Sequence, residues 1–291
     1  GVATYRNKMP LTICVRDVSQ QSLDLKLGAW DYQDNPTMLN PDTVACLAFS
    51  AGRYDWGGVE VLADTLSAVT REWQTVLFPA AFSTVPVVLA SPNSLSGGHP
   101  YTVAIRNVTP EGFEVRLMLE EQNSGVPVAE DISFVALTPG QGSVDSRKVL
   151  VGRTPEQAVG DAATGGYRIA FDSIFTSIPL CFAQMQTASD NIASTLRLRS
   201  RDLYSVTILR DREKSASFSR PAAEQVGYLL IGQDMADGIA PSPIFQPLST
   251  PIHRSVRIYT LSGRRVNTNR LPQGVYIIYN SDGSVQKLFV R

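Results

Sequence analysis

Few residues in this chain could do chemistry, and three of them adjoin at Trp30, Asp31 and Tyr32 in the stretch "GAWDYQD". An aromatic ring can lie against the apolar face of a sugar, and a fixed carboxylate can bind its hydroxyls. We therefore predict that a ligand site would use these three residues, on a loop. A Trp at the end of a strand also packs into cores and interfaces. An exposed Trp30 would favour binding, and a buried Trp30 would favour a purely structural protein.

The sequence contains no recognisable catalytic motif. His99 and His253, the only histidines, are far apart and do not suggest a His-dependent triad or a zinc site. No Gly-x-Ser-x-Gly, Walker or His-Glu-x-x-His motif occurs. The acidic groups at Glu120 and Asp211 are typical of solvated hairpins rather than of two glycosidase carboxylates across a cleft. We expect no catalytic residue, cofactor or metal, unless an enzymatic domain lies upstream of residue 1.

The composition is that of a folded protein without a strong charge preference. Of its 291 residues, 43% are hydrophobic and 18% charged, and the net charge is -1. This balance gives no general attraction to nucleic acid or anionic membranes, and no apolar run is long enough to span a bilayer. The three cysteines fit no metal or redox motif, although a Cys14–Cys46 bridge is possible if their strands adjoin. Alternating Arg residues in "RLRSRD" (197–202) predict an exposed, salt-bridged strand face.

The elements that would position these residues are repeated along the chain. "FPAAFSTVP" (78–86) and "FDSIFTSIP" (171–179) share Phe-x3-Phe-x3-Pro, and each precedes an apolar strand. A strand-turn-strand segment follows in both copies, with turns at Thr109–Gly112 and at Arg201–Asp202. Each copy closes on a matching phrase, "PVAEDISFVAL" and then "PAAEQVGYLLI". The repeated Phe and Pro residues are typical of core packing and strand edges, so they define a fold and not a site.

A third copy at the N-terminus is incomplete. "LTICVRDVSQQSLDLKL" (11–27) aligns without gaps with "YTVAIRNVTPEGFEVRL" (101–117), and "PDTVACLAF" (41–49) matches the closing phrase. This copy has no Phe-x3-Phe-x3-Pro segment. Either upstream sequence has been removed, or the unit is completed from elsewhere.

Period-two alternation, with turn residues between the runs, predicts an all-β chain of tandem small antiparallel β-sandwich repeats plus a small C-terminal β-module. We expect a partial repeat at 1–52, full repeats at 53–140 and 141–233, a Pro-rich linker at 234–254 and a small β-meander at 255–291. The chain could form a homo-oligomer, and its three units could pack as an intrachain pseudo-trimer or lie in a line. Trp56 and Trp73 are expected to be structural.

The repeats resemble the H-type lectin domain, best over Trp73–Leu137, less well over Tyr167–Ile231, and in part over Leu11–Phe49. The shared features are an apolar strand after Pro, a Thr-Pro-x-Gly-Phe turn, and a final strand ending in Ala and an aliphatic residue. The resemblance implies a six-stranded antiparallel sandwich, often trimeric, that binds N-acetylgalactosamine-type sugars.

The same resemblance points to particular residues. An aromatic sugar contact of the family stands seven positions after the turn Phe, which corresponds to Trp30, to Glu120 and approximately to Asp211 in the three copies. Pro10 and Pro100 stand where the family has a sugar-contacting Arg. The implied ligand-binding set is Trp30, Asp31, Tyr32, Glu120 and Asp211.

The C-terminal stretch is similar to sorting domains of type IX secretion. The matching segments are "IYTLSGRRV" (258–266), "LPQGVYI" (271–277) and "KLFVR" (287–291). This similarity implies an exported protein, secreted or held at the cell surface. We expect a non-catalytic carbohydrate-binding or adhesion protein whose partner is a glycan. The alternative is a structural spacer or oligomerisation module of a larger surface protein.

Overall fold

In the computed structural model the chain is all-β, as its alternation predicts. The structure describes residues 3–19, 22–33, 42–48, 50–123, 129–216 and 221–233, and the strands at 257–260, 265–266, 274–279 and 285–290. Within these ranges the only helical element is the short 3-10 turn η1 (Ala162–Thr164), and no helix there is long and apolar enough to cross a membrane. The chain divides into an N-terminal body, Gly1–Asp237, and a C-terminal body, Gly238–Arg291.

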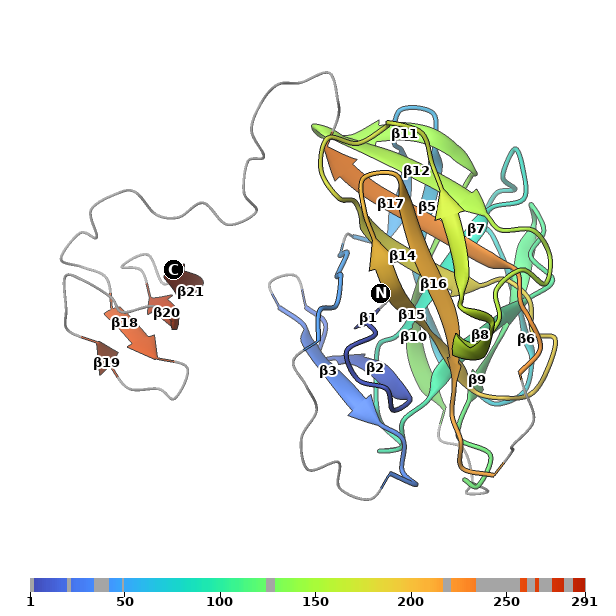
Figure 1. Cartoon of the computed structure of the whole chain (residues 1–291), viewed down its shortest axis with the longest axis horizontal. Helices are drawn as coiled ribbons and strands as arrows, with labels where there is room; N and C mark the ends of the chain where they lie inside the picture. Colours follow the sequence, from blue (N-terminus) through green and yellow to red (C-terminus); the bar gives the residue numbers. More distant parts are fainter. Residues whose placement is uncertain are drawn as a thin grey trace. The chain divides into compact units, whose positions relative to one another are not determined.

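The strands between Gly52 and Leu137 form two sheets around one core (Figure 1). One sheet holds, in order, β4 (Gly52–Asp55), β5 (Glu60–Val69), β10 (Glu130–Leu137) and β7 (Val87–Pro92), and the other holds β6 (Gln74–Leu77), β9 (Gly112–Met118) and β8 (Thr102–Arg106). The repeated Phe residues lie in the core between them. Phe78 and Phe82 are buried and contact edge to face, with ring centres 5.0 Å apart.

The next strands repeat this arrangement. One sheet holds β11 (Gly140–Val144), β12 (Arg147–Arg153), β17 (Val226–Gln233) and β14 (Leu180–Met185), and the other holds β1 (Ala3–Thr4), β15 (Ser194–Arg201), β16 (Ser205–Arg212) and β13 (Tyr167–Ala170). Phe171 and Phe175 also meet edge to face, at 5.5 Å. Another apolar core joins the sheet β4-β5-β10-β7 to the sheet β11-β12-β17-β14, where Val135 and Val87 of the first pack with Val149 and Leu229 of the second.

Among its described residues the first repeat contributes the short β1 and one hairpin, β2 (Leu11–Arg16) and β3 (Asp24–Ala29). Its register is that of β8 and β9, because Ile13 pairs with Leu27 as Val103 pairs with Leu117. The gap-free alignment of the two segments is therefore confirmed. Residues 42–48 follow in the place of β10 without forming a strand.

The closing phrase of each repeat carries a buried carboxylate that anchors a loop. Glu130 accepts hydrogen bonds from the Ser96 and Gly97 N–H groups at 2.8 and 2.7 Å. Glu224 accepts one from the Ser189 N–H at 2.9 Å. Asp42 takes the corresponding place in the first repeat and accepts from the Asn7 side-chain amide at 3.3 Å. A buried carboxylate needs such partners, which explains why the phrase recurs.

The C-terminal body contains a four-stranded antiparallel sheet in the order β19 (Arg265–Val266), β18 (Arg257–Thr260), β20 (Gly274–Tyr279) and β21 (Val285–Val290). Because β20 pairs with β18 and not with β19, the prediction of a simple meander is wrong. The two-residue β19 offers few ladder bonds, so it occupies the edge. The predicted linker, 234–254, lies outside the described residues.

Candidate functional site

Trp30 follows β3 directly, and its side chain is buried, with 1% of its surface exposed. Among the described residues its indole Nε1 has no hydrogen-bond partner. The ring therefore presents no open face on which a sugar could stack. Asp31 beside it is exposed, and Tyr32 is half-buried. Of the two readings of Trp30, its burial favours the structural one, and ligand binding by this residue stays a prediction.

The carboxylate of Asp31 is the centre of an exposed polar cluster. Its Oδ2 lies 2.6 Å from His99 Nδ1 and accepts a hydrogen bond from the Asn123 side-chain amide at 3.3 Å. The side chains of Asp31 and His99 are 39% and 53% exposed. We call Asp31, His99 and Asn123 the loop cluster. It combines a carboxylate, an imidazole and an amide, which together offer donors and acceptors at the surface.

His99 was not among the residues predicted for a site. The sequence does carry a signal for it, since His99 directly precedes Pro100, the position that the lectin resemblance assigns to a sugar-contacting Arg. The loop that holds His99 follows β7, and the loop that holds Asn123 follows β9. The cluster therefore joins the first repeat to the second.

Glu120 is not on solvated surface as the sequence suggested, because its side chain is 5% exposed. Its Oε2 accepts a hydrogen bond from the Tyr32 N–H at 3.2 Å. Burial raises the pKa of this carboxyl above its ordinary value, and the neighbouring Asp31 and Glu213 carboxylates add to the rise, although the Tyr32 N–H opposes it. Glu120 thus holds the first and second repeats together.

Asp211 lies in strand β16 and is also 5% exposed, so its prediction as a surface loop residue is wrong. Burial raises its pKa to about 6, although Arg197 opposes the rise. The Arg197 guanidinium bonds Asp211 at 3.2 Å and Asp42 at 3.1 Å. The predicted exposed face of alternating Arg residues is therefore wrong at Arg197. This residue does alternate with the core residues Leu196 and Leu198, but Asn7 and Asp42 of the first repeat cover the face on which it lies.

Glu213, not Asp211, has the contact that corresponds to Glu120. Its Oε1 accepts from the Glu121 N–H at 3.3 Å, as Glu120 accepts from Tyr32. Burial is the main reason that the Tyr32 pKa is raised, and the Glu213 and Asp211 charges contribute. The structure therefore brings all the residues predicted for the site to one end of the N-terminal body. These are Trp30, Asp31, Tyr32, Glu120 and Asp211.

Three further features lie outside this set of residues: a buried ion cluster at Arg210, a free thiol at Cys46 and a stacked ring at Trp73. Arg210 is buried and binds Asp190 at 2.6 Å and Glu224 at 3.2 Å. Cys46 is a free, exposed thiol, so the Cys14–Cys46 bridge does not form. Trp73 stacks under the Arg106 and Arg116 guanidinium groups, 4.0 and 4.5 Å from its ring centre. In the described part of the chain no cluster of His, Cys, Asp or Glu side chains could hold a metal ion.

Comparison with known proteins gives one match. A family model of the H-type lectin domain matches residues 73–126, which run from the start of β6 past β9 and include His99, Glu120 and Asn123. No curated protein and no solved structure matches the chain. The match supports the lectin-like sandwich of the second repeat.

Proposed function

We propose that this protein is a non-catalytic, lectin-like protein that binds carbohydrate at the loop cluster of Asp31, His99 and Asn123. The observation that carries the proposal is the exposed contact of Asp31 with His99 and Asn123, two residues inside the segment that matches the H-type lectin domain. Sugar hydroxyls are recognised by a small number of fixed donors and acceptors. The three side chains supply these, and their mutual hydrogen bonds hold them in place.

This site differs from the one that the lectin resemblance implies for Trp30. The Trp30 ring is buried beneath the loop, so it supports the position of Asp31 instead of contacting the sugar. Tyr32, which follows Asp31 in the chain, has a half-buried ring, and its hydroxyl accepts from the Lys214 N–H at 3.2 Å. We infer that recognition at the loop cluster is mainly polar.

The proposal includes an intrachain pseudo-trimer of the three repeats. It is supported by backbone contacts at each junction: Tyr32 N–H to Glu120, Glu121 N–H to Glu213, and Lys214 N–H to Tyr32. Export, a location at the cell surface and a role in adhesion are further proposals. Their support is the similarity of residues 258–291 to type IX sorting domains.

The test is a glycan array with the intact chain and three variants. Asp31→Asn and His99→Ala should lose the binding that the parent shows, because each removes a polar partner of the sugar. Asp64→Asn, a matched change at an exposed Asp on β5, should bind as the parent does. Undiminished binding by both loop-cluster variants would place the sugar elsewhere.

A structural spacer is the second candidate, and the burial of Trp30, Glu120 and Asp211 favours it. In that case the residues at this end of the body serve only to join repeats. Absence of glycan binding by the parent chain, folded as judged by circular dichroism, would support the spacer.

A further inference from the structure

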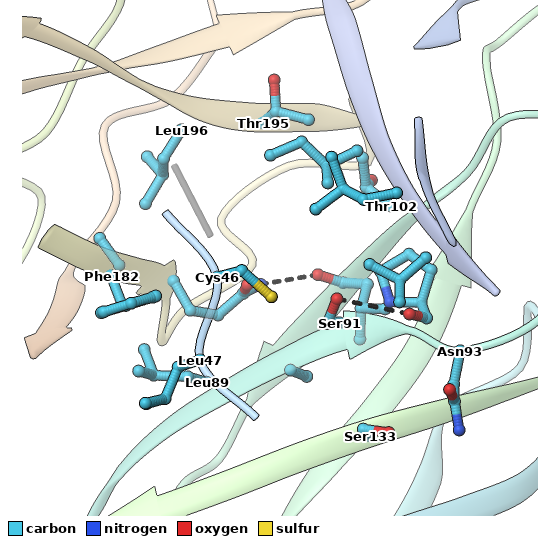
Figure 2. Close-up of a pocket in the computed structure, with 18 of the residues that line it drawn as sticks. Cys46, Leu47, Leu89, Ser91, Asn93, Thr102, Ser133, Phe182, Thr195 and Leu196 are labelled. Atoms are coloured by element: carbon cyan, nitrogen blue, oxygen red, sulfur yellow. Dashed lines mark hydrogen bonds between the residues drawn. The ribbon is translucent and has the colours of Figure 1, made fainter. Parts of the chain in front are cut away.

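The N-terminal body contains an apolar groove beside the incomplete first repeat. It has a volume of about 250 Å³ and is lined by Leu23, Leu25, Leu47, Leu89, Phe182 and Leu196, among others. Figure 2 shows Cys46 near the centre of the view, with Leu47, Leu89, Phe182 and Leu196 to its left. All three repeats therefore contribute to its wall.

The second repeat shows what normally covers this surface. Leu25 of the hairpin β2–β3 is 37% exposed, whereas Val115, its counterpart in β9, is 0% exposed. Val115 is covered by the sheet that contains β7 and β10. Val18, at the tip of the hairpin, is likewise 49% exposed, while its counterpart Val108 packs on the core. The hairpin thus has the inner face of a sandwich without, among the described residues, its second sheet.

Residues 42–48 mark where that second sheet would lie. They align with β10, which in the second repeat pairs with β7 over Val87–Pro92. Cys46 falls at the position of Phe134, a core residue that is 6% exposed and packs on Phe113. Cys46 itself is exposed. Val44 is a bridge residue, but no described strand pairs with this segment as β7 pairs with β10.

We propose that the groove is the docking site of one further β7-type strand, a copy of the Phe-x3-Phe-x3-Pro segment and the apolar strand after it. The strand enters beside Ala3 and pairs antiparallel with residues 44–48, as β7 pairs with β10. The alignment places Ala3 where Asn93 follows β7, and β1 fixes that point by pairing with β15. Strand addition of this kind gains backbone hydrogen bonds and fills apolar pockets with alternate side chains.

The size of the groove favours this occupant over a small molecule. A volume of about 250 Å³ lies below the roughly 300–1,000 Å³ of typical small-molecule pockets. Its lining includes the strands β2, β3, β7, β14 and β15. An extended segment matches such a strand-lined groove, and the other copies of the repeat already show the sequence that fits.

The test is a fusion in which a copy of residues 78–92 replaces Gly1 and Val2 directly before Ala3. The readout is alkylation of Cys46, which a docked strand would cover. Trypsin releases the three cysteines in separate peptides, so each rate is measured in one digest. Cys181 is the unreactive reference, because it is buried and burial raises its pKa to about 12.

We expect the fusion to lose Cys46 alkylation and to melt several degrees higher than the parent. A control fusion, with Ser in place of the copied Val87, Val88 and Leu89, should alkylate and melt as the parent does. A fusion whose Cys46 reacts as fast as in the parent would overturn the proposal. Protection of Cys46 in the parent by rising protein concentration would overturn it in favour of a second copy. Protection by oleate but not by the fusion would do so in favour of a lipid site.

Discussion

Replacing Trp30 by Ala separates the two roles that the sequence allowed for this residue. With 1% of its surface exposed, Trp30 belongs to a packed interior, and truncation of a buried Trp to Ala costs about 3–5 kcal/mol. A domain has a total stability of about 5–15 kcal/mol. We therefore expect Trp30→Ala to lower the urea midpoint strongly or to unfold the N-terminal body.

Two further variants make the magnitude interpretable. Trp30→Phe keeps most of the ring and removes an indole Nε1 that has no partner in the described structure, so its cost should stay below about 2 kcal/mol. Trp73→Ala removes a half-buried ring under two guanidinium groups and should cost about 1–2 kcal/mol. Unfolding is followed by far-UV circular dichroism, because each variant removes a Trp fluorophore.

One result would refute this reasoning. If Trp30→Ala unfolds at the midpoint of the parent while its glycan binding is lost, the ring is at the surface and stacks on sugar. A lowered urea midpoint for Trp30→Ala would instead assign stability to Trp30. A near-parental urea midpoint for Asp31→Asn, together with its loss of glycan binding, would assign recognition to Asp31.

Three other changes test the buried polar groups and one close approach. Because burial raises the Asp211 pKa to about 6 from an ordinary value of 3.8, its contribution to stability is full below about pH 4 and falls by roughly 3 kcal/mol as the pH rises through 6. Asp211→Asn should remove that fall. If the free energies of unfolding of parent and variant differ by the same amount at pH 4 and at pH 7, the prediction is wrong. Arg210→Met leaves Asp190 and Glu224 without their cation and should cost about 3–5 kcal/mol in urea unfolding at pH 7; an unchanged midpoint would show that the cluster is solvated. Gly112→Ala would put a Cβ well inside contact distance of the Val76 carbonyl oxygen and should part β6 from β9, at a cost of about 1–3 kcal/mol; a parental thermal midpoint would show that the strands can shift.

The sequence predicted those parts of the fold that depend on local patterns of a few residues. Alternation and turn residues are local, so the all-β class and the turn between β8 and β9 followed from them. The comparison of one copy with another gave more. It predicted the register of β2 on β3, and it placed Phe78 and Phe171 in equivalent roles, which their matching edge-to-face contacts confirm.

The candidate site was predictable only in part, because its decisive contacts join distant segments. Asp31 meets His99 and Asn123 across a junction between repeats, and no local pattern encodes such a junction. Asp211 is buried together with Arg197 on a strand face that the first repeat covers, and alternation cannot reveal that cover. From their charge alone, Glu120 and Asp211 are therefore expected at the surface, whereas in the structure they are buried where repeats meet.

The first repeat differs from the other two at the junction, as well as in showing no second sheet among its described residues. Glu120 and Glu213 each accept a backbone N–H through the side chain from a neighbouring repeat, whereas the Trp30 side chain at the corresponding position can only donate and has no partner among the described residues. The residue after Trp30 is the exposed Asp31 of the loop cluster, and the strand before it, β3, lines the open groove. A strand docked in that groove would pack directly against β3. The two proposals are thus linked through one strand, since whatever completes the first repeat also fixes the base from which Asp31 would meet a sugar.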